Sequence, residues 1–454
     1  MTQPDPTDLL SLDRDVARAY AAWRAWTRAV AKDPETHADQ EPLERWRHVA
    51  GQSTYDALGA PAPGAFDAPL RDGLRRWVYT LAQARIARPL DAELARARAA
   101  RSAQVNVPEP HLASWGEAWQ GIVVAPTSTE RRAWLGVASE RGPAVASIVR
   151  RRAERREEVA QRMGLERGDA LFAGSPLALA SAAESLLDRT EDLARELLHR
   201  ARRQLELPLD PPLAVDAIHI AVAREAPEGW PARLTSHWLD EVFGRFARGL
   251  RLELPPLPAA VGASSFVRAC ASFGGALRVA GASPSLPFAV ARDPEFAAMH
   301  RFACVFGALP ASAAFQRRVL GNGARVADAQ SRVLARSALL HVRLEAARFL
   351  LRNTRAPDRF EHLTHRLFGA PLPAPLVGAW PAPDDDAPSR LVGLLTAPAL
   401  SSELVDRFDV DWFANPRAVL HLRAIASAPA HEGPVEDLAP AVTPLARSFE
   451  EALG

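Results

Sequence analysis

The side chains of this chain that could do chemistry are its histidines and their acidic neighbours. The sequence has 12 histidines. No two stand four residues apart, the spacing at which one helix face presents two imidazoles to a zinc ion. His362 and His365 are three apart with Glu361 beside them, and residues at that spacing share a helix face. This segment precedes a proline-rich stretch and lacks a clear third ligand, so we interpret it as a polar surface turn.

A second set of potential ligands is spread along the C-terminal half, and it comprises His300, His341, Glu345, His362 and His365. Such residues hold a metal ion only if the fold gathers them from different helices. His341 and Glu345 are four apart and would point together on one helix. The simpler interpretation of that pair is a polar contact on a helix surface. His300 by itself is interpreted as a helix histidine at the edge of the core.

Several other kinds of chemistry are excluded by residues that the sequence lacks. It has no C-x-x-C and no G-x-S-x-G, and its only lysine, Lys32, does not stand in a phosphate-binding P-loop. Cys270 and Cys304 lie in apolar helical patterns, where a reduced cysteine acts as a small hydrophobe. The run Asp384-Asp385-Asp386 could attract a cation, but a solvated loop explains it better. We therefore expect no cofactor and no metal.

Composition and charge restrict the partners and the location. With 55 basic and 54 acidic residues, the net charge of +1 gives no reason to bind nucleic acid or an anionic membrane. The preference for arginine over lysine is typical of a GC-rich bacterial genome. The N-terminus is polar, and no stretch approaches the ~18 apolar residues of a membrane span. We expect a cytoplasmic bacterial protein.

Helical periodicity dominates the elements that would position these residues. Pro89 is expected to break one helical pattern, and Gly164 is expected to end another. The alternation of Leu250 to Leu254 predicts a half-buried strand, the residues 213–225 fit a strand or a short helix, and the last 25 residues are expected to fray. The helical patterns cover residues 8–30, 67–102, 130–163, 175–207, 263–278, 293–309, 312–320, 326–353, 390–407 and 416–426.

The predicted fold class is mainly α, with at most a small β-sheet. A proline-rich connection follows Pro208 and is the best candidate for a domain boundary. It would separate an N-terminal helical region, residues 1–207, from a second helical domain, residues 208–454. The two could also form one continuous fold.

One helical segment carries a resemblance to a known family. Residues 265–277 resemble the active-site helix of the oligopeptidase and oligoendopeptidase group of zinc metallopeptidases (gluzincins), which reads roughly T-L-x-H-E-F-G-H-A-L. Looser likenesses are found at residues 404–422, similar to the closing segment of such proteins, and at residues 145–200, similar to their helical region before the catalytic domain. The residues that match the helix motif are Phe273, Gly274, Ala276 and Leu277.

The diagnostic residues of that motif are the ones that differ. The resemblance places the two zinc histidines at Ala271 and Gly275 and the general-base glutamate at Ser272. The further glutamate ligand of the family falls near His300. Gly274 and Gly275 together inside a helix predict either close packing of the backbone or a site that has lost larger side chains.

The resemblance thus implies a multi-helical metallopeptidase-like fold with a central cleft and without the zinc-binding residues. The expected function is a catalytically inactive protein whose cleft binds a peptide or a protein partner. One alternative is an active metal-dependent hydrolase that uses the scattered histidines as non-standard ligands. Another is a helical structural adaptor without a cleft.

Overall fold

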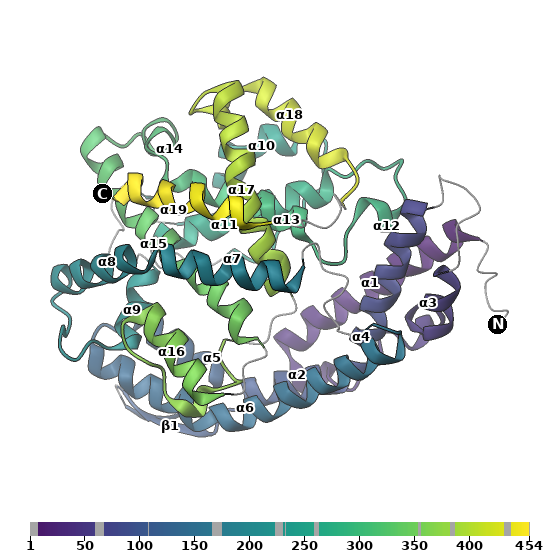
Figure 1. The fold of residues 1–454 in the computed structure, drawn as a ribbon, viewed down its shortest axis with the longest axis horizontal. Coiled ribbons are helices and arrows are strands. Elements are labelled where there is room, and N and C mark those ends of the chain that lie inside the picture. Colours follow the sequence, from purple (N-terminus) through teal and green to yellow (C-terminus); the bar gives the residue numbers. More distant parts are fainter. Residues whose placement is uncertain are drawn as a thin grey trace.

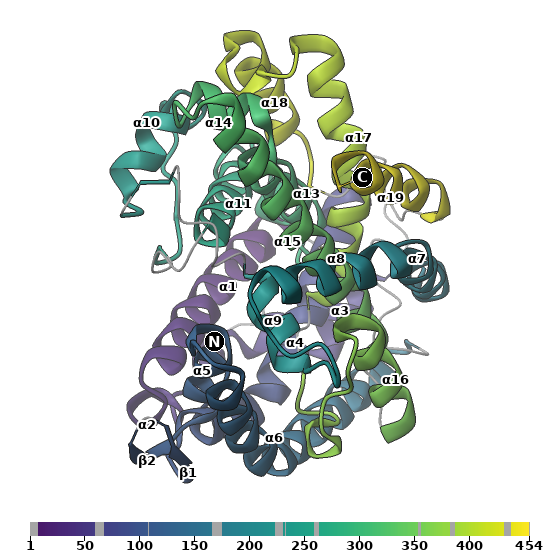
Figure 2. The same ribbon diagram turned by 90° about the vertical axis from the view of Figure 1, so that its left-hand side faces the viewer.

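The computed structural model describes residues 8–59, 68–107, 109–165, 175–222, 230–231, 233–257, 263–352, 356–381, 386–430 and 437–453. Helices make up most of it, as the sequence predicts, and they surround a central group of crossing helices (Figures 1 and 2). In chain order the elements are α1 (Leu9–Lys32), α2 (Pro34–His37), η1 (Glu44–Ala50), α3 (Gln52–Leu58), α4 (Ala68–Ala99), β1 (Ala103–Asn106), β2 (Pro110–Ala113), α5 (Trp115–Val124), α6 (Ser128–Arg162), α7 (Pro176–Arg189), α8 (Glu191–Gln204), α9 (Ala214–Ala221), α10 (Ser236–Ala247), α11 (Ala263–Ala280), α12 (Phe288–Ala291), α13 (Ala297–Ala308), η2 (Leu309–Ala311), α14 (Ala313–Arg318), α15 (Ala324–Leu351), α16 (Pro357–Phe368), η3 (Ala374–Leu376), α17 (Ala387–Phe408), η4 (Trp412–Ala414), α18 (Pro416–Ser427) and α19 (Ala439–Leu453).

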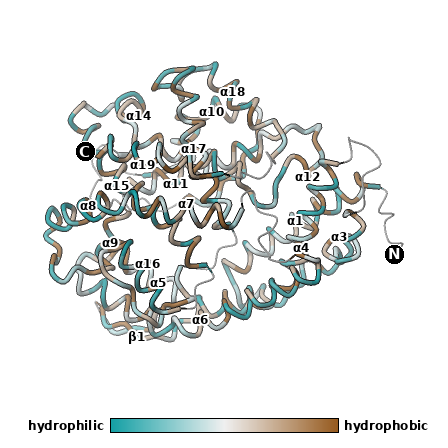
Figure 3. The backbone as a smooth tube through the Cα atoms, in the orientation of Figure 1, coloured by the Kyte–Doolittle hydropathy of each residue, from teal (hydrophilic) through white to brown (hydrophobic). Residues whose placement is uncertain are grey.

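The apolar faces of these helices meet in three large cores. Helices α1, α3 and the first half of α4 form the N-terminal core, where Trp77 is buried and donates its indole N–H to the carbonyl of Arg292 at 2.7 Å. Hydropathy alternates along individual helices, as in amphipathic helices packed on one face (Figure 3). Amphipathic packing of this kind stabilises helices more than intrinsic propensity does.

Helix α17 connects the other two cores. Its first half, with Leu391 and Leu395, lies in the central core, and its second half, with Leu400 and Leu404, lies in the core around α10, α11 and α13. The central core also combines residues from both sides of the predicted boundary at residue 207, for example Leu186 and Leu339. The division into 1–207 and 208–454 stays a prediction.

The small sheet lies elsewhere than the sequence predicts. It is an antiparallel hairpin of β1 and β2, in which Ala103 pairs with Ala113. The strand expected at Leu250 to Leu254 does not form. These leucines instead pack in an extended segment against the core of α10, α11 and α13. Their alternation is real, but no neighbouring strand pairs with them within the described residues, and the strand prediction was wrong.

Three other details of the helical prediction need correction. Helix α4 continues through Pro89, and α6 contacts it on both sides of the proline, through Arg156 with Gln83 before it and Arg151 with Glu93 after it. The pattern over 175–207 is two helices separated at Thr190. Of the last 25 residues, those that the structure describes beyond Ala430 contain the helix α19, which buries Leu445 and Phe449, whereas 431–436 and 454 lie outside the described residues. The residues 213–225 contain the helix α9, and Gly164 ends α6 as expected, with a left-handed φ of 71°.

Buried arginines donate hydrogen bonds to the carbonyl groups at the C-terminal ends of several helices. The last carbonyls of a helix have no partner within it and carry partial negative charge, so a guanidinium is a favourable donor there. Arginine offers several N–H donors in a planar fork, which lysine cannot do. The arginine-rich composition therefore has a structural use. The buried examples are Arg131 to Ala125 and Pro126, Arg202 to Phe368, Arg278 to Ala426, and Arg343 to Leu187 and Arg366.

One of these arginines belongs to a buried ion pair. Arg131 on α6 and Asp216 on α9 are both fully buried, and Arg131 donates from Nη2 at 2.7 Å and from Nε at 2.9 Å to one carboxylate oxygen. The Ser128 hydroxyl donates to both oxygens of Asp216. The pair connects α6, α9 and the end of α5.

None of the described helices combines the length and the apolar character needed to cross a bilayer.

Candidate functional site

The predicted motif helix α11 packs antiparallel against α13, and small residues let the two backbones approach closely. A methyl group at Gly274 would lie 2.5 Å from the carbonyl oxygen of Phe302, and one at Gly307 would lie 3.1 Å from the Cβ of Ala271. Real Cβ atoms do not come as close to backbone as the first of these distances. Of the two explanations for the glycine pair, the structure supports close backbone packing at Gly274.

The four motif positions lie at or beside this contact. Ala271 and Ser272 are half-buried, and Gly275 is buried. A methyl group at Gly275 would lie 3.3 Å from Cγ of Met299 and 3.8 Å from Cβ of Ala303, so α13 covers this position. His300 follows Met299 on α13 and is half-buried. The Cβ atom of His300 faces α17, because a methyl group added at Gly393 of that helix would lie 2.6 Å from it.

The donor atoms at these positions do not fit a zinc ion. A catalytic zinc has three protein ligands, drawn from imidazole, thiolate and carboxylate groups. Ala271 and Gly275 offer no such atom, Ser272 offers one hydroxyl, and only His300 carries an imidazole. In addition, an imidazole at position 275 would require Met299 to move. No group of three or more His, Cys, Asp and Glu side chains in the described part of the chain could hold a metal ion.

The scattered histidines are only partly brought together. His341 and Glu345 on α15 approach each other, with Nε2 3.9 Å from Oε1. His362 and His365 are exposed on α16, so the expected surface position holds, but the segment is a helix and not a turn. Of the acidic run, Asp384 and Asp385 lie outside the described residues, and Asp386 immediately precedes α17.

Glu345 is the centre of a polar cluster that the sequence did not reveal. It was interpreted as half of a surface pair, but its side chain is only 2% exposed. Arg348, one turn later, donates from Nη1 to Oε1 at 2.7 Å, and Arg390 of α17 donates from Nε to Oε2 at 2.8 Å. Arg348 could have been suspected from its i,i+3 spacing. Arg390 could not, because only the packing of α17 on α15 brings it there.

The charges in this cluster shift the acidity of its members. Burial raises the pKa of Glu345, but His341, Arg348 and Arg390 together outweigh it, so the pKa is lower than usual and the carboxylate is charged at neutral pH. Desolvation lowers the pKa of His341, although its side chain is 63% exposed. Burial, with a smaller effect of Glu345, raises the pKa of the Cys304 thiol on α13 to about 12.

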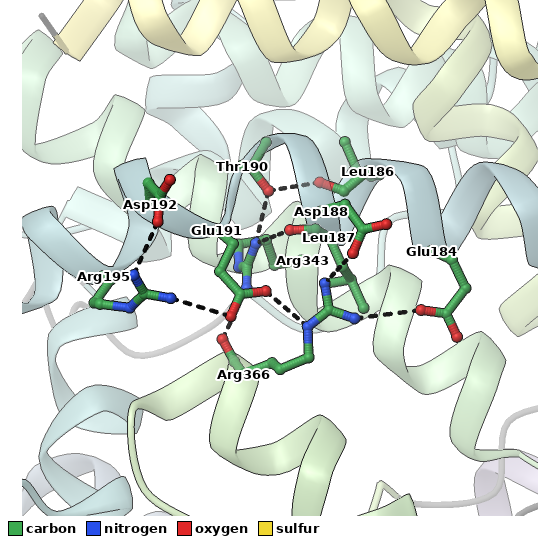
Figure 4. Close-up of polar contacts among 10 residues, drawn as sticks. All are labelled: Glu184, Leu186, Leu187, Asp188, Thr190, Glu191, Asp192, Arg195, Arg343 and Arg366. Atoms are coloured by element: carbon green, nitrogen blue, oxygen red, sulfur yellow. Dashed lines mark hydrogen bonds and ion pairs between the residues drawn. The ribbon is translucent and has the colours of Figure 1, made fainter.

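A second network fixes the helix that carries this cluster. Arg343 of α15 is fully buried and donates from Nη1 to the carbonyl of Leu187 and to Oγ1 of Thr190, both at 2.7 Å (Figure 4). Its Nη2 donates to the carbonyl of Arg366 on α16. The side chain of Arg366 lies between three carboxylates of α7 and α8, which are Glu184 at 3.3 Å, Asp188 at 2.6 Å and Glu191 at 2.7 Å.

This network defines the position of α15 relative to its neighbours. Charge-assisted hydrogen bonds with several partners are stronger and more directional than neutral ones. Burial raises the pKa of Glu191, but the hydrogen bond and charge of Arg366 outweigh it and lower the pKa overall. The two arginines thus join α7, α8, α15 and α16 on the side of α15 away from Glu345.

The comparisons with known proteins give a likeness of fold. No family model matches the sequence, and no curated protein matches it. Among solved structures, a protein from Chlamydophila abortus described as a "putative peptidase" superposes with a TM-score of 0.55 at 10% sequence identity, over 99% of this chain and 91% of that one. An oligoendopeptidase-F from Enterococcus faecium superposes with a TM-score of 0.49 at 10% identity, over 98% of this chain and 97% of that one.

The first of these likenesses extends over almost the whole of both chains. The protein therefore has a multi-helical, peptidase-like fold with one small sheet, as the resemblance in the sequence implies. At this level of identity the likeness concerns the fold, and function has to be argued from the site.

Proposed function

We propose that this protein is a non-catalytic relative of the peptidases that keeps their helical framework to bind a peptide or a segment of a partner protein. The observation that carries the proposal is the contact between α11 and α13. There the motif positions for two imidazoles and a carboxylate are occupied by Ala271, Gly275 and Ser272.

The chemistry of these positions supports the loss of the reaction. Metal-assisted hydrolysis of a peptide bond needs an ion to polarise the carbonyl and a base to activate water. A methyl group, a hydrogen atom and a neutral hydroxyl do neither. The active-hydrolase alternative requires other ligands, and the described residues contain no group of three that could serve.

Retention of a binding role is supported by exposed polar groups on α15, a helix that packs against both α11 and α17. His341 is 63% exposed and Arg348 is 30% exposed, although both contact a carboxylate that is almost completely buried. A buried carboxylate that orients partly exposed cations is typical of a recognition site, where polar groups are held in place by others behind them.

Two measurements on the untagged full-length chain test the proposal. The first is metal content by mass spectrometry after purification without added metal, combined with hydrolysis of a mixed, internally quenched peptide library. We expect far less than one equivalent of zinc and no hydrolysis with or without added zinc. About one equivalent that a chelator removes, together with hydrolysis that stops on its removal, would overturn the proposal.

The second measurement is equilibrium dialysis of the same library without its quencher, with the retained peptides identified by mass spectrometry. Retention of a distinct subset supports a peptide-binding protein. If no peptide is retained, the binding role is wrong and a structural adaptor becomes the better explanation. The matched control is bovine serum albumin, which reports non-specific retention.

A further inference from the structure

The polar cluster on α15 points to the part of a ligand that this protein recognises. His341, Glu345 and Arg348 follow one another at spacings of four and three residues, so they form one stripe along a helix face. The middle residue is buried and the two outer ones reach solvent. The stripe therefore presents an imidazole and a guanidinium on either side of a hidden carboxylate.

Arg348 has N–H donors that form no hydrogen bond within the described residues. Its one hydrogen bond within the described residues runs from Nη1 to Glu345, at 2.7 Å, and its Nε is buried without a partner. A guanidinium carries five N–H donors in a planar fork that matches the two oxygens of a carboxylate. The Nη2 group makes no hydrogen bond with a described residue and is not enclosed as Nε is, so a ligand that arrives from solvent would meet Nη2 and the second N–H of Nη1.

Glu345 holds Arg348 in place without using up its capacity. Its second oxygen accepts from Arg390 of α17, and this fixes the carboxylate between two helices. A side chain that is already oriented loses less conformational entropy when it binds a ligand. Glu345 thus acts as a positioning residue behind Arg348.

We infer that Arg348 and His341 bind the C-terminal carboxylate of a peptide. The inference rests on the proposed peptide-binding function and specifies its ligand. Arg348 provides two parallel N–H donors to the carboxylate oxygens. The imidazole of His341 lies two helical turns before Arg348 but reaches to 3.9 Å from the same Oε1 of Glu345, and it supplies a third donor. Inorganic phosphate presents similar oxygens, and the experiment below separates the two sources.

The experiment uses the full chain labelled with ¹³C at the Cε1 position of histidine, which reports binding through the His341 resonance. That resonance is assigned by its loss in His341→Gln. The probes are acetyl-trialanine with a free carboxylate, the same peptide with a C-terminal amide, and inorganic phosphate. We expect the free acid to shift the resonance saturably and the amide to leave it unchanged.

Two variants of Arg348 and one control complete the test. Arg348→Gln should weaken binding of the free acid about tenfold or more, the usual effect of losing a charge-assisted hydrogen bond. Arg348→Lys keeps a positive charge beside Glu345, so the fold is retained while the planar fork is lost, and it should weaken binding as well. Arg332→Gln removes the same charge from an exposed position on the same helix and should change nothing.

Three results would overturn the inference. The first is an equal response to the acid and the amide, and the second is unchanged affinity in both Arg348 variants. The third is Arg348-dependent binding of phosphate without binding of the acid. Dialysis of the peptide library distinguishes this failure from failure of the proposed function, because peptides retained regardless of their C-terminus would leave a peptide-binding protein that lacks this particular site.

Discussion

The close contact between α11 and α13 can be tested by adding a single methyl group. Gly274→Ala would place a carbon atom 2.5 Å from the carbonyl oxygen of Phe302 and 2.8 Å from Cβ of Phe306. The first neighbour is backbone and cannot rotate away, so relief requires the two helices to separate. Favourable contacts between carbon atoms occur near ~3.5–4.0 Å, which makes the required movement on the order of 1 Å.

The expected loss of stability combines two opposing effects. Overpacking a well-packed contact costs about 1–3 kcal/mol, and a clash with backbone belongs at the upper end of that range. Alanine in a helix interior is more favourable than glycine by about 1 kcal/mol. The net expectation for Gly274→Ala is a destabilisation of about 2 kcal/mol in the free energy of unfolding.

Two other glycines provide matched controls. Gly136 is exposed within α6, and a methyl group there has no neighbour within 4 Å, so Gly136→Ala should stabilise the protein by about 0.5–1 kcal/mol. Gly275→Ala meets Cγ of Met299 at 3.3 Å, and this flexible side chain can adjust. We expect Gly275→Ala to be close to neutral.

The assay is urea denaturation followed by tryptophan fluorescence and circular dichroism, with all three variants compared with the unchanged chain. The predicted order of stability is Gly136→Ala, then Gly275→Ala, then Gly274→Ala. If Gly274→Ala were as stable as Gly136→Ala, the two helices would not be in contact at this point. The structural basis for placing the motif positions on a closed helix interface would then be lost.

Three further predictions concern the buried polar groups. Asp216→Ala leaves the fully buried Arg131 without its partner and should destabilise the chain by about 3–5 kcal/mol in urea denaturation, and a loss below about 1 kcal/mol would contradict the buried pair. The pKa of Glu345 is lower in the folded chain than its ordinary value of 4.5, so the stability it contributes is present above that value and lost as the pH falls through the folded value. Glu345→Gln should therefore lower stability at about pH 7 and reduce the further loss at about pH 4, and an unchanged acid dependence would contradict the shift. With a thiol pKa of about 12, the half-buried Cys304 should react with iodoacetamide at about pH 8 roughly a thousandfold more slowly in the folded chain than in urea, as intact mass spectrometry would show, and fast native labelling would contradict the raised pKa.

Periodic apolar patterns were sufficient to predict the main helices. Helices α1, α6, α11 and α15 were expected within a few residues of their observed bounds, because each has an apolar stripe that recurs every three or four residues. The mainly α fold class follows from the same patterns. The resemblance at residues 265–277 also indicated the kind of fold that the structural comparison supports.

The sheet could not be placed from the same information. Leu250 to Leu254 have the alternation of a strand, and their side chains do pack on one side, but a strand also needs a partner for its backbone hydrogen bonds. The hairpin of β1 and β2 has that partner nearby in the chain, since its pairs run from Asn106 with Pro110 to Ala103 with Ala113, although neither of its four-residue strands has a distinctive pattern.

By itself the sequence determined which side chains are present at the motif positions and which segments are helical, because both depend on residue type and local spacing. The tertiary structure alone decided that α7 and α8 are separate helices and which charges meet. Arg343 binds the carbonyl of Leu187 and the hydroxyl of Thr190, where the chain separates α7 from α8, from more than 150 residues away. Arg390 reaches Glu345 in the same way, across 45 residues. Hydrogen bonds and ion pairs of this kind act over a few ångströms in space. They join residues that are far apart along the chain, and no local sequence pattern identifies such partners.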